Sequence, residues 1–276
     1  MLTIRHNIWK SEINEIVRSL SFWVGSAVTA ILMGTQGFVA KDEHAYSMRN
    51  IWEVLLFEKK FPKDDTFQTL ISTGHLGVYT YFIPLLASFC YLAFQVQYHG
   101  FGFERAVKIR LPKKSYHRST YVSALFAGGI TLVAGHFIYV IMVGVLAGIR
   151  FGLLADWSCF LYIMQTAIEA FLAGMFWNSV VYVLLHFIRN IYLLGTLPFL
   201  LKYIWGCVQH FIWLNYPDTS FQYGDMFYFF DDDGIYFIFS MGVKGGIIVG
   251  LLTLVLLLNY YVSGLLERRR IDYGSW

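Results

Sequence analysis

The side chains of this 276-residue chain that could do chemistry are few and scattered. Five of its eight histidines lie in or at the ends of different apolar segments, namely His75, His99, His136, His186 and His210. His75 and His136 could together ligate a haem b, but no two histidines within one predicted helix support such a site. Isolated histidines in apolar segments more often hydrogen-bond within a helix bundle. One open interpretation is therefore a membrane haem protein for electron transfer, or an enzyme that uses these histidines.

Three charged residues interrupt segments that are otherwise apolar: Glu169, Lys202 and Lys244. Charges in lipid are costly and usually face the helix bundle or a cavity. With a rise of about 1.5 Å per residue in an apolar core about 30 Å thick, all three fall in one layer near the midplane. Glu169 could pair with either lysine as a structural ion pair, or it could line a substrate path, and both alternatives stay open.

The sequence contains neither the phosphate-binding GxxxxGK[ST] pattern nor the zinc-binding HExxH pattern. The stretch Asp231–Gly234 lacks the alternating ligand spacing of a calcium loop. We therefore predict no catalytic residues, metal site or cofactor in the chain itself. The net charge of +3 is also too small to indicate a nucleic-acid partner.

The composition is that of a membrane protein. Hydrophobic residues make up 57% and charged residues 14% of the chain, against about 25% charged residues in soluble domains. Six segments reach the roughly 20 apolar residues that cross a bilayer: 21–40, one within 66–103, 119–149, 157–188, 190–217 and 234–266. These features predict an all-α polytopic protein with six transmembrane helices, forming a single transmembrane domain over residues 1–276.

The lysines and arginines indicate an orientation, because cytoplasmic loops carry an excess of them. With the N-terminus inside, 13 of the 21 lie in cytoplasmic segments, namely 1–20, 99–119, 186–194 and 264–276. The outer segments are then 41–65, 150–156 and 215–234, and they hold 12 of the 18 acidic residues. Both termini are therefore expected in the cytoplasm.

Two segments beside the apolar ones read as surface helices. In residues 1–20, an apolar stripe of Trp9, Ile13, Ile16, Val17 and Leu20 leaves the charged residues elsewhere, which predicts an amphipathic helix on the inner membrane surface. The charged residues in question are Arg5, Lys10, Glu12, Glu15 and Arg18. Residues 51–61 in the outer loop predict a second such helix on the outer leaflet.

One short cytoplasmic gap gathers much of the positive charge. It begins with Glu104 and continues with Arg105, Lys108, Arg110, Lys113, Lys114 and Arg118. Such charges hold a loop inside during membrane insertion, and this role alone could explain their number. A protein partner or anionic lipid is the alternative.

The order of these parts resembles the membrane subunit of type-2 ABC exporters, a bacterial permease family. The resemblance covers nearly the whole chain, from the stretch WKSEINEIVRSLSFW to the tail GLLERRR. Its most specific part is the loop, where the family shows Glu, an apolar stretch, Leu-x-x-Pro-[Ile/Val]-Ser-Arg and an aromatic residue. Comparable places are filled here by Glu104, Leu111, Pro112, Ser115, Tyr116 and Arg118. The gap from Glu104 to Pro112 is shorter than in the family, and Pro-Lys-Lys-Ser replaces Pro-[Ile/Val]-Ser-Arg.

In that family a separate ATPase moves the permease by pushing on a short coupling helix, which needs apolar side chains for a groove and charges for orientation. The resemblance assigns the apolar role to Phe101, Phe103, Val107 and Ile109, and the charged role to Glu104, Arg105 and Lys108. Pro112 would end this helix at Leu111. Lys113, Lys114 and Arg118 would then meet anionic headgroups, each contributing about 1 kcal/mol.

The resemblance implies a permease subunit in the bacterial cytoplasmic membrane rather than an enzyme. It would form a homodimer with a second permease copy and bind two copies of an ATP-binding subunit, which would hold ATP and Mg²⁺. The aromatic segments suit an amphipathic substrate, a peptide or a lipid-like molecule. A non-transporting immunity or sensor protein of the same fold is a third alternative.

Overall fold

The computed structural model describes residues 8–35, 37–41, 46–53, 55–56, 70–71, 74, 78–100, 113–146, 157–188, 190–215 and 242–272. In chain order the elements are α1 (Ile8–Arg18), α2 (Leu20–Met33), β1 (Gly37–Lys41), β2 (Tyr46–Asn50), α3 (Ile51–Glu53), α5 (Val78–Gly100), α7 (Lys113–Leu146), α8 (Trp157–Leu184), α9 (Ile191–Asn215) and α11 (Gly242–Asp272). The described part is therefore almost entirely helical, and each of the six predicted apolar segments contains one long helix.

Among the described residues, three helices are long and apolar enough to cross a membrane, and they lie within α7, α8 and α9. A fourth candidate is the pair α1 and α2, which meets the same criteria only together and is bent by 64°. The apolar helical parts of α5 and α11 are shorter. The helical membrane protein predicted from composition is thus confirmed in outline. Six spans and cytoplasmic termini stay predictions.

The first predicted span is wrong beyond residue 33. It was expected to run to residue 40, but α2 ends at Met33 and is followed by the antiparallel pair β1–β2, in which Gly37 lies opposite Asn50. A Cβ atom on Gly34 would collide with the ring of Trp52, so only glycine fits there. The Trp52 Nε1–H donates to the Ile31 carbonyl at 2.7 Å, which satisfies one of the carbonyls that a helix end leaves open.

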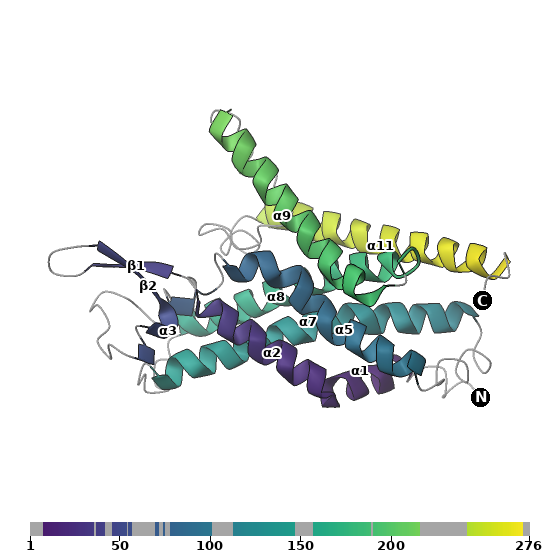
Figure 1. Cartoon of the computed structure of the whole chain (residues 1–276), viewed down its shortest axis with the longest axis horizontal. Coiled ribbons are helices and arrows are strands. Elements are labelled where there is room, and N and C mark those ends of the chain that lie inside the picture. The colour runs from purple at the N-terminus through teal and green to yellow at the C-terminus, as the bar shows by residue number, and fades with distance from the viewer. Residues whose placement is uncertain are drawn as a thin grey trace.

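In the stretch predicted as a helix on the outer leaflet, the described residues are helical: Ile51–Glu53 form a short α-helix, and residues 55–56 form a π-helical turn. Ile51 and Leu55 are buried in the core and do not face the membrane, while Leu56 is exposed. The apolar side chains of this stretch therefore pack against the bundle, because the β1–β2 pair brings them back onto it. We call this end of the molecule, with β1, β2 and α3, the hairpin end (Figure 1).

The centre of the fold is the antiparallel pair α7 and α8, against which α2 and α5 pack (Figure 1). The two helices approach so closely at Gly128 and Gly174 that a Cβ atom on either would collide with the backbone of the other. Small residues permit such close approach of helices in membranes. Asn178 Nδ2 adds a hydrogen bond to the Ala124 carbonyl in the next turn.

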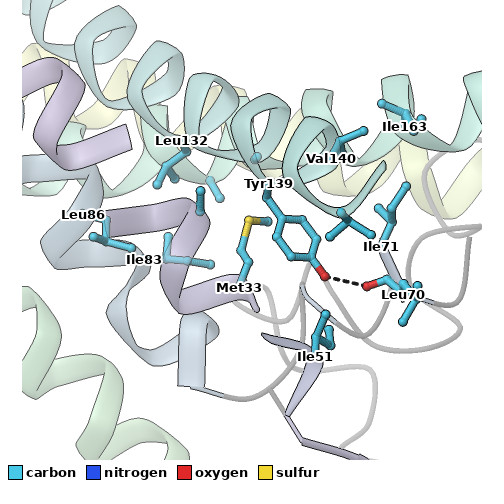
Figure 2. Packing of buried hydrophobic residues seen from close by; sticks show 14 of the residues in the cluster. Met33, Ile51, Leu70, Ile71, Ile83, Leu86, Leu132, Tyr139, Val140 and Ile163 are labelled. Carbon is cyan, nitrogen blue, oxygen red and sulfur yellow. Dashed lines mark hydrogen bonds between the residues drawn. The ribbon is translucent and has the colours of Figure 1, made fainter. Parts of the chain in front are cut away.

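Buried apolar side chains fill the hairpin end of the bundle. Figure 2 shows Met33, Ile83, Leu86, Leu132 and other members of this cluster, which joins α2, α5, α7 and α8. The Tyr139 hydroxyl points toward Leu70, another member of the cluster, and donates to its carbonyl at 2.7 Å. This contact ties the segment at residue 70 to α7.

The opposite end is where α5 ends and α7 begins, and we call it the loop end. The chain enters α1 and leaves α11 at this same end (Figure 1). α9 projects away from the bundle, and both α9 and α11 expose many large apolar side chains, among them Leu193, Tyr203, Leu257 and Tyr261. Such exposed apolar surface suits lipid or a second membrane subunit.

Candidate functional site

The predicted coupling residues Phe101, Phe103, Glu104, Arg105, Val107, Lys108 and Ile109 lie outside the described residues. The two ends that hold this loop are described: α5 runs to Gly100, and α7 begins at Lys113. The helices around these two ends form the described part of this region. The loop's own conformation stays a prediction.

Of the three predicted lipid-anchoring residues, the structure places the side chain of one. Arg118 is exposed in the second turn of α7. Lys113 and Lys114 belong to the first turn of α7, but their side chains lie outside the described set. Binding of Arg118 to lipid headgroups stays a prediction.

A buried polar cluster surrounds the start of α7, and we call it the α7 junction. It joins five helices, and its members are Glu12, Tyr91, His117, Ser119, Tyr121, Ser123, Tyr182, Tyr260 and Ser263. Apolar residues such as Ile16, Phe22, Cys90 and Leu125 pack around it. Residues of α1, α5, α8 and α11 thus gather around the first three turns of α7.

His117 is the centre of the α7 junction. Its Nε2 atom lies 3.3 Å from the Tyr260 carbonyl of α11, and its Nδ1 atom lies 3.3 Å from the Tyr182 hydroxyl of α8. A carbonyl only accepts, so a hydrogen bond to Tyr260 requires a proton on Nε2. In the neutral ring, Nδ1 then accepts from Tyr182. The ring also stacks on Tyr260 and on Tyr121.

A second bond of the same kind lies one turn further along α7. The Tyr121 hydroxyl donates to the Leu256 carbonyl of α11 at 2.7 Å. His117 and Tyr121 are four residues apart on α7, as Leu256 and Tyr260 are on α11, so the two bonds lie on facing stripes of antiparallel helices. Asn259 adds a bond to Ser179 of α8 at 2.8 Å. α11 is therefore held in one register by directional bonds.

α1 enters the α7 junction through an acidic residue. The Glu12 carboxylate accepts a hydrogen bond from the Ser123 hydroxyl of α7, and Glu12 is only 5% exposed. The apolar stripe predicted for α1 is confirmed in part, because Ile16 is buried and Trp9 stacks near Phe126. The prediction that Glu12 points away from this stripe was wrong.

One hydroxyl group in the α7 junction, Ser119 Oγ, is buried and makes no hydrogen bond within the described part of the chain, whereas the buried Tyr91 hydroxyl interacts with the Gln95 side chain. Ser119 lies one turn before Ser123 on α7, and the Tyr91 phenol interacts electrostatically with Glu12. Burial raises the pKa of Glu12 to about 7, against the lowering effect of the Ser123 hydrogen bond. The carboxyl therefore sits in a site that favours its neutral form.

The charges predicted inside the membrane lie apart from the α7 junction. Glu169 of α8 is fully buried, and its Oε1 atom accepts from Gln165 Nε2 at 3.3 Å, while its Oε2 atom accepts no hydrogen bond in the described structure. Lys202 of α9 is also buried. Lys244 lies in the first turn of α11, but its side chain is not among those described. Pairing of Glu169 with either lysine stays a prediction.

The histidine proposed as a haem ligand has another partner. His136 is fully buried, and its Nε2 atom lies 3.1 Å from the Thr166 hydroxyl of α8. His75 lies outside the described residues. Among the residues that the structure does describe, no three His, Cys, Asp or Glu side chains gather as metal ligands would. His136 therefore serves the contact between α7 and α8.

Sequence reasoning missed most of the α7 junction, including His117, Tyr121, Tyr182 and Tyr260. A signal for it does exist in the four-residue spacing of His117 and Tyr121 directly after the basic loop. Hydroxyl and imidazole groups recurring at that spacing mark one helical stripe, which in an apolar segment must find polar partners.

No family model, no curated protein and no solved structure matches this chain.

Proposed function

We propose that this chain is the membrane-spanning permease subunit of an ABC exporter. A separate ATPase, bound in two copies at the loop of residues 99–119, would drive it, and a second permease copy would complete a homodimer. The substrate would be an amphipathic molecule, a peptide or a lipid-like compound. The chain would act in the cytoplasmic membrane of a bacterium.

The observation that supports this proposal best is the position of the α7 junction. The basic loop joins the end of α5 to the start of α7, and the first turns of α7 are bonded to α1, α8 and α11. A displacement of the loop would therefore act on all of these helices. A loop that served only membrane topology would have no need of such connections.

The closely packed pair α7 and α8 gives the displacement a rigid element to act upon. The glycine contact between Gly128 and Gly174 and the bond from Asn178 to Ala124 hold the two helices together along several turns. When the ATPase binds ATP and pushes the loop, α7 and α8 would move as one body against α9 and α11. The exposed apolar faces of α9 and α11 would then meet lipid or the second copy.

Glu169 is the residue that we assign to the substrate side of this mechanism. It is buried in the middle of α8, and its Oε2 atom accepts no hydrogen bond from the described residues. An amphipathic substrate with a hydrogen-bond donor or a cationic group would find an acceptor there once α8 moves.

The test is to search the neighbouring reading frames for a P-loop ATPase and to reconstitute the chain with that ATPase in lipid vesicles. We expect the chain to stimulate ATP hydrolysis, and Glu104→Ala and Phe103→Ala to abolish that stimulation while membrane insertion stays intact. The matched control is Glu53→Ala, because Glu53 is an exposed acid at the hairpin end. Its stimulation should equal that of the wild type.

Unchanged hydrolysis in the presence of the chain, or unchanged coupling in both loop variants, would overturn the proposal. The haem alternative is checked on the same purified protein, since a haem b gives a Soret absorption band that shifts on reduction.

A further inference from the structure

Glu12 is an acidic residue on the buried face of a helix whose other charged side chains are exposed. Lys10, Glu15 and Arg18 of α1 all face outward, whereas Glu12 is 5% exposed and lies one turn before the fully buried Ile16. A serine or alanine would fill this position at no electrostatic cost. A carboxyl in such a place therefore calls for a physical account.

The surroundings of Glu12 offer hydroxyl groups instead of cations. Ser123 of α7 donates to its carboxylate, the Tyr91 phenol of α5 interacts with it electrostatically, and Ser119 of α7 carries a further buried hydroxyl. α2, which also contacts α1, contains no titratable side chain. In the described structure, the charge that acts on Glu12 is that of Glu15, which repels a second negative charge.

This arrangement penalises the ionised carboxylate and suits the neutral carboxylic acid. A buried charge without an opposite charge loses its hydration and gains little in return. A protonated carboxyl can also donate a hydrogen bond, and the buried Ser119 hydroxyl has acceptor capacity that no other described group uses.

We propose that Glu12 is a proton-binding group that fixes α1 on α5 and α7, so that α1 is held firmly while the carboxyl is protonated and loosely after the proton leaves. The device links the N-terminal helix to the acidity of the surrounding solution. Where the proposed permease function holds, the same step would make coupling at the loop end depend on cytoplasmic pH.

The pH range follows from the direction of the shift. Burial raises the pKa of Glu12 from its usual 4.5 to about 7 when α1 is seated, so the seated form binds the proton more tightly than the released form. The stabilisation is therefore fully present below pH 4.5, declines as pH rises toward 7, and is absent above it. A shift of this size changes the seating equilibrium on the order of 100-fold.

Hydrogen exchange of the purified full chain in lipid nanodiscs tests the device without any ATPase or substrate. Exchange times at pH 5 and pH 8 are corrected for the intrinsic rate, and α8 serves as the internal reference. We expect the amides of α1 to lose protection on the order of 100-fold between pH 5 and pH 8 in the wild type.

Three variants sharpen the result. Glu12→Gln should keep α1 protected at both pH values, because the amide stays neutral. Glu15→Gln is the matched control on the exposed face, and it should retain the loss of protection with a slightly lower midpoint, since the repelling charge is gone. Ser123→Ala should move the midpoint upward, because the hydrogen bond that stabilises the carboxylate is removed.

Equal protection of α1 at pH 5 and pH 8 in the wild type would overturn the proposal, as would a Glu12→Gln variant that responds to pH like the wild type. A failure of the permease function would leave these results unchanged, because they concern the isolated chain. If α1 is released at high pH but the coupling of ATP hydrolysis in the reconstituted exporter does not change with pH, only the proposed pH dependence of coupling would be contradicted.

Discussion

The two ends of the bundle are held together by different kinds of contact. At the hairpin end, apolar side chains of α2, α5, α7 and α8 interlock with Ile51, Leu70 and Ile71, and hydrogen bonds from Tyr139 and Trp52 tie the adjoining segments to them. At the loop end, apolar packing is joined by buried polar contacts between α7 and its neighbours, made by Glu12, His117 and Tyr121.

This difference determines what each end can do. Apolar packing is lost in proportion to the surface exposed, so the hairpin end resists displacement in every direction. Hydrogen bonds between side chains and carbonyls have direction and can be exchanged for other partners at a net cost of about 1 kcal/mol each. The loop end is therefore the end at which helices can change partners, and it is also the end that carries the basic loop.

The largest expected effect comes from the glycine contact between α7 and α8, the two helices that run through both ends of the bundle. Gly174→Ala places a methyl group against the backbone of Gly128, where neither helix can give way without separating. We expect a loss of about 3 kcal/mol in unfolding free energy, measured by thermal unfolding in detergent.

The control is Gly250→Ala, because a Cβ atom there meets no other atom within 4 Å. Removing a glycine from the interior of α11 should leave stability unchanged or raise it by up to about 1 kcal/mol. Equal destabilisation by both substitutions would mean that close approach of α7 and α8 is not the cause.

A pair of tyrosine substitutions compares the two ends directly. Tyr139→Phe removes the hydroxyl that donates to the Leu70 carbonyl. Because Leu70 lies in the buried apolar cluster, the loss of this bond should lower the unfolding free energy by about 1–3 kcal/mol. Tyr121→Phe should cost about 1 kcal/mol or less, because the Leu256 carbonyl keeps its bond within α11. Thermal unfolding of the two variants measures the difference. A larger loss for Tyr121→Phe would reverse the comparison.

His117 supplies a prediction about movement at the loop end. Ser263 of α11 is fully buried, so a Ser263→Cys variant should react slowly with a maleimide reagent. Adding His117→Ala removes the ring that bridges α7, α8 and α11. Local opening of α11 should then cost less free energy, so the labelling rate should rise at least about tenfold. Cys207 is already exposed and must be replaced by serine in both variants. An unchanged rate would show that apolar contacts alone hold α11.

The parts of this fold that could be predicted are those that hydropathy determines. Each of the six apolar segments contains a helix, and the stripe with Ile16 does face the bundle. The turn after Gly34 could not be predicted, because it depends on the contact with Trp52, which lies 18 residues further along the chain.

The α7 junction could not be predicted for a different reason. In α7 and α11 nearly every face is apolar, so hydrophobic periodicity has no contrast that would show which side meets a neighbour. Register is set instead by isolated polar groups such as His117 and by backbone carbonyls such as that of Tyr260. The spacing of His117 and Tyr121 indicates a polar stripe, but nothing in the sequence identifies the carbonyls that it meets. The prediction for Glu12 was wrong because it assumed that a charged residue of an amphipathic helix lies on the exposed face, whereas this acid is buried.

The smallest expected effect concerns lipid at the two ends. Arg118 is exposed two turns into α7 at the loop end, and Glu53 is exposed at the hairpin end. An arginine near an anionic membrane surface contributes about 1 kcal/mol to lipid binding. Adding phosphatidylglycerol to the detergent-purified chain should therefore raise its unfolding temperature more than phosphatidylcholine does. Arg118→Gln should reduce this difference between the two lipids, whereas Glu53→Gln should leave it unchanged. Equal responses of the two variants would mean that Arg118 does not anchor the loop end to anionic lipid.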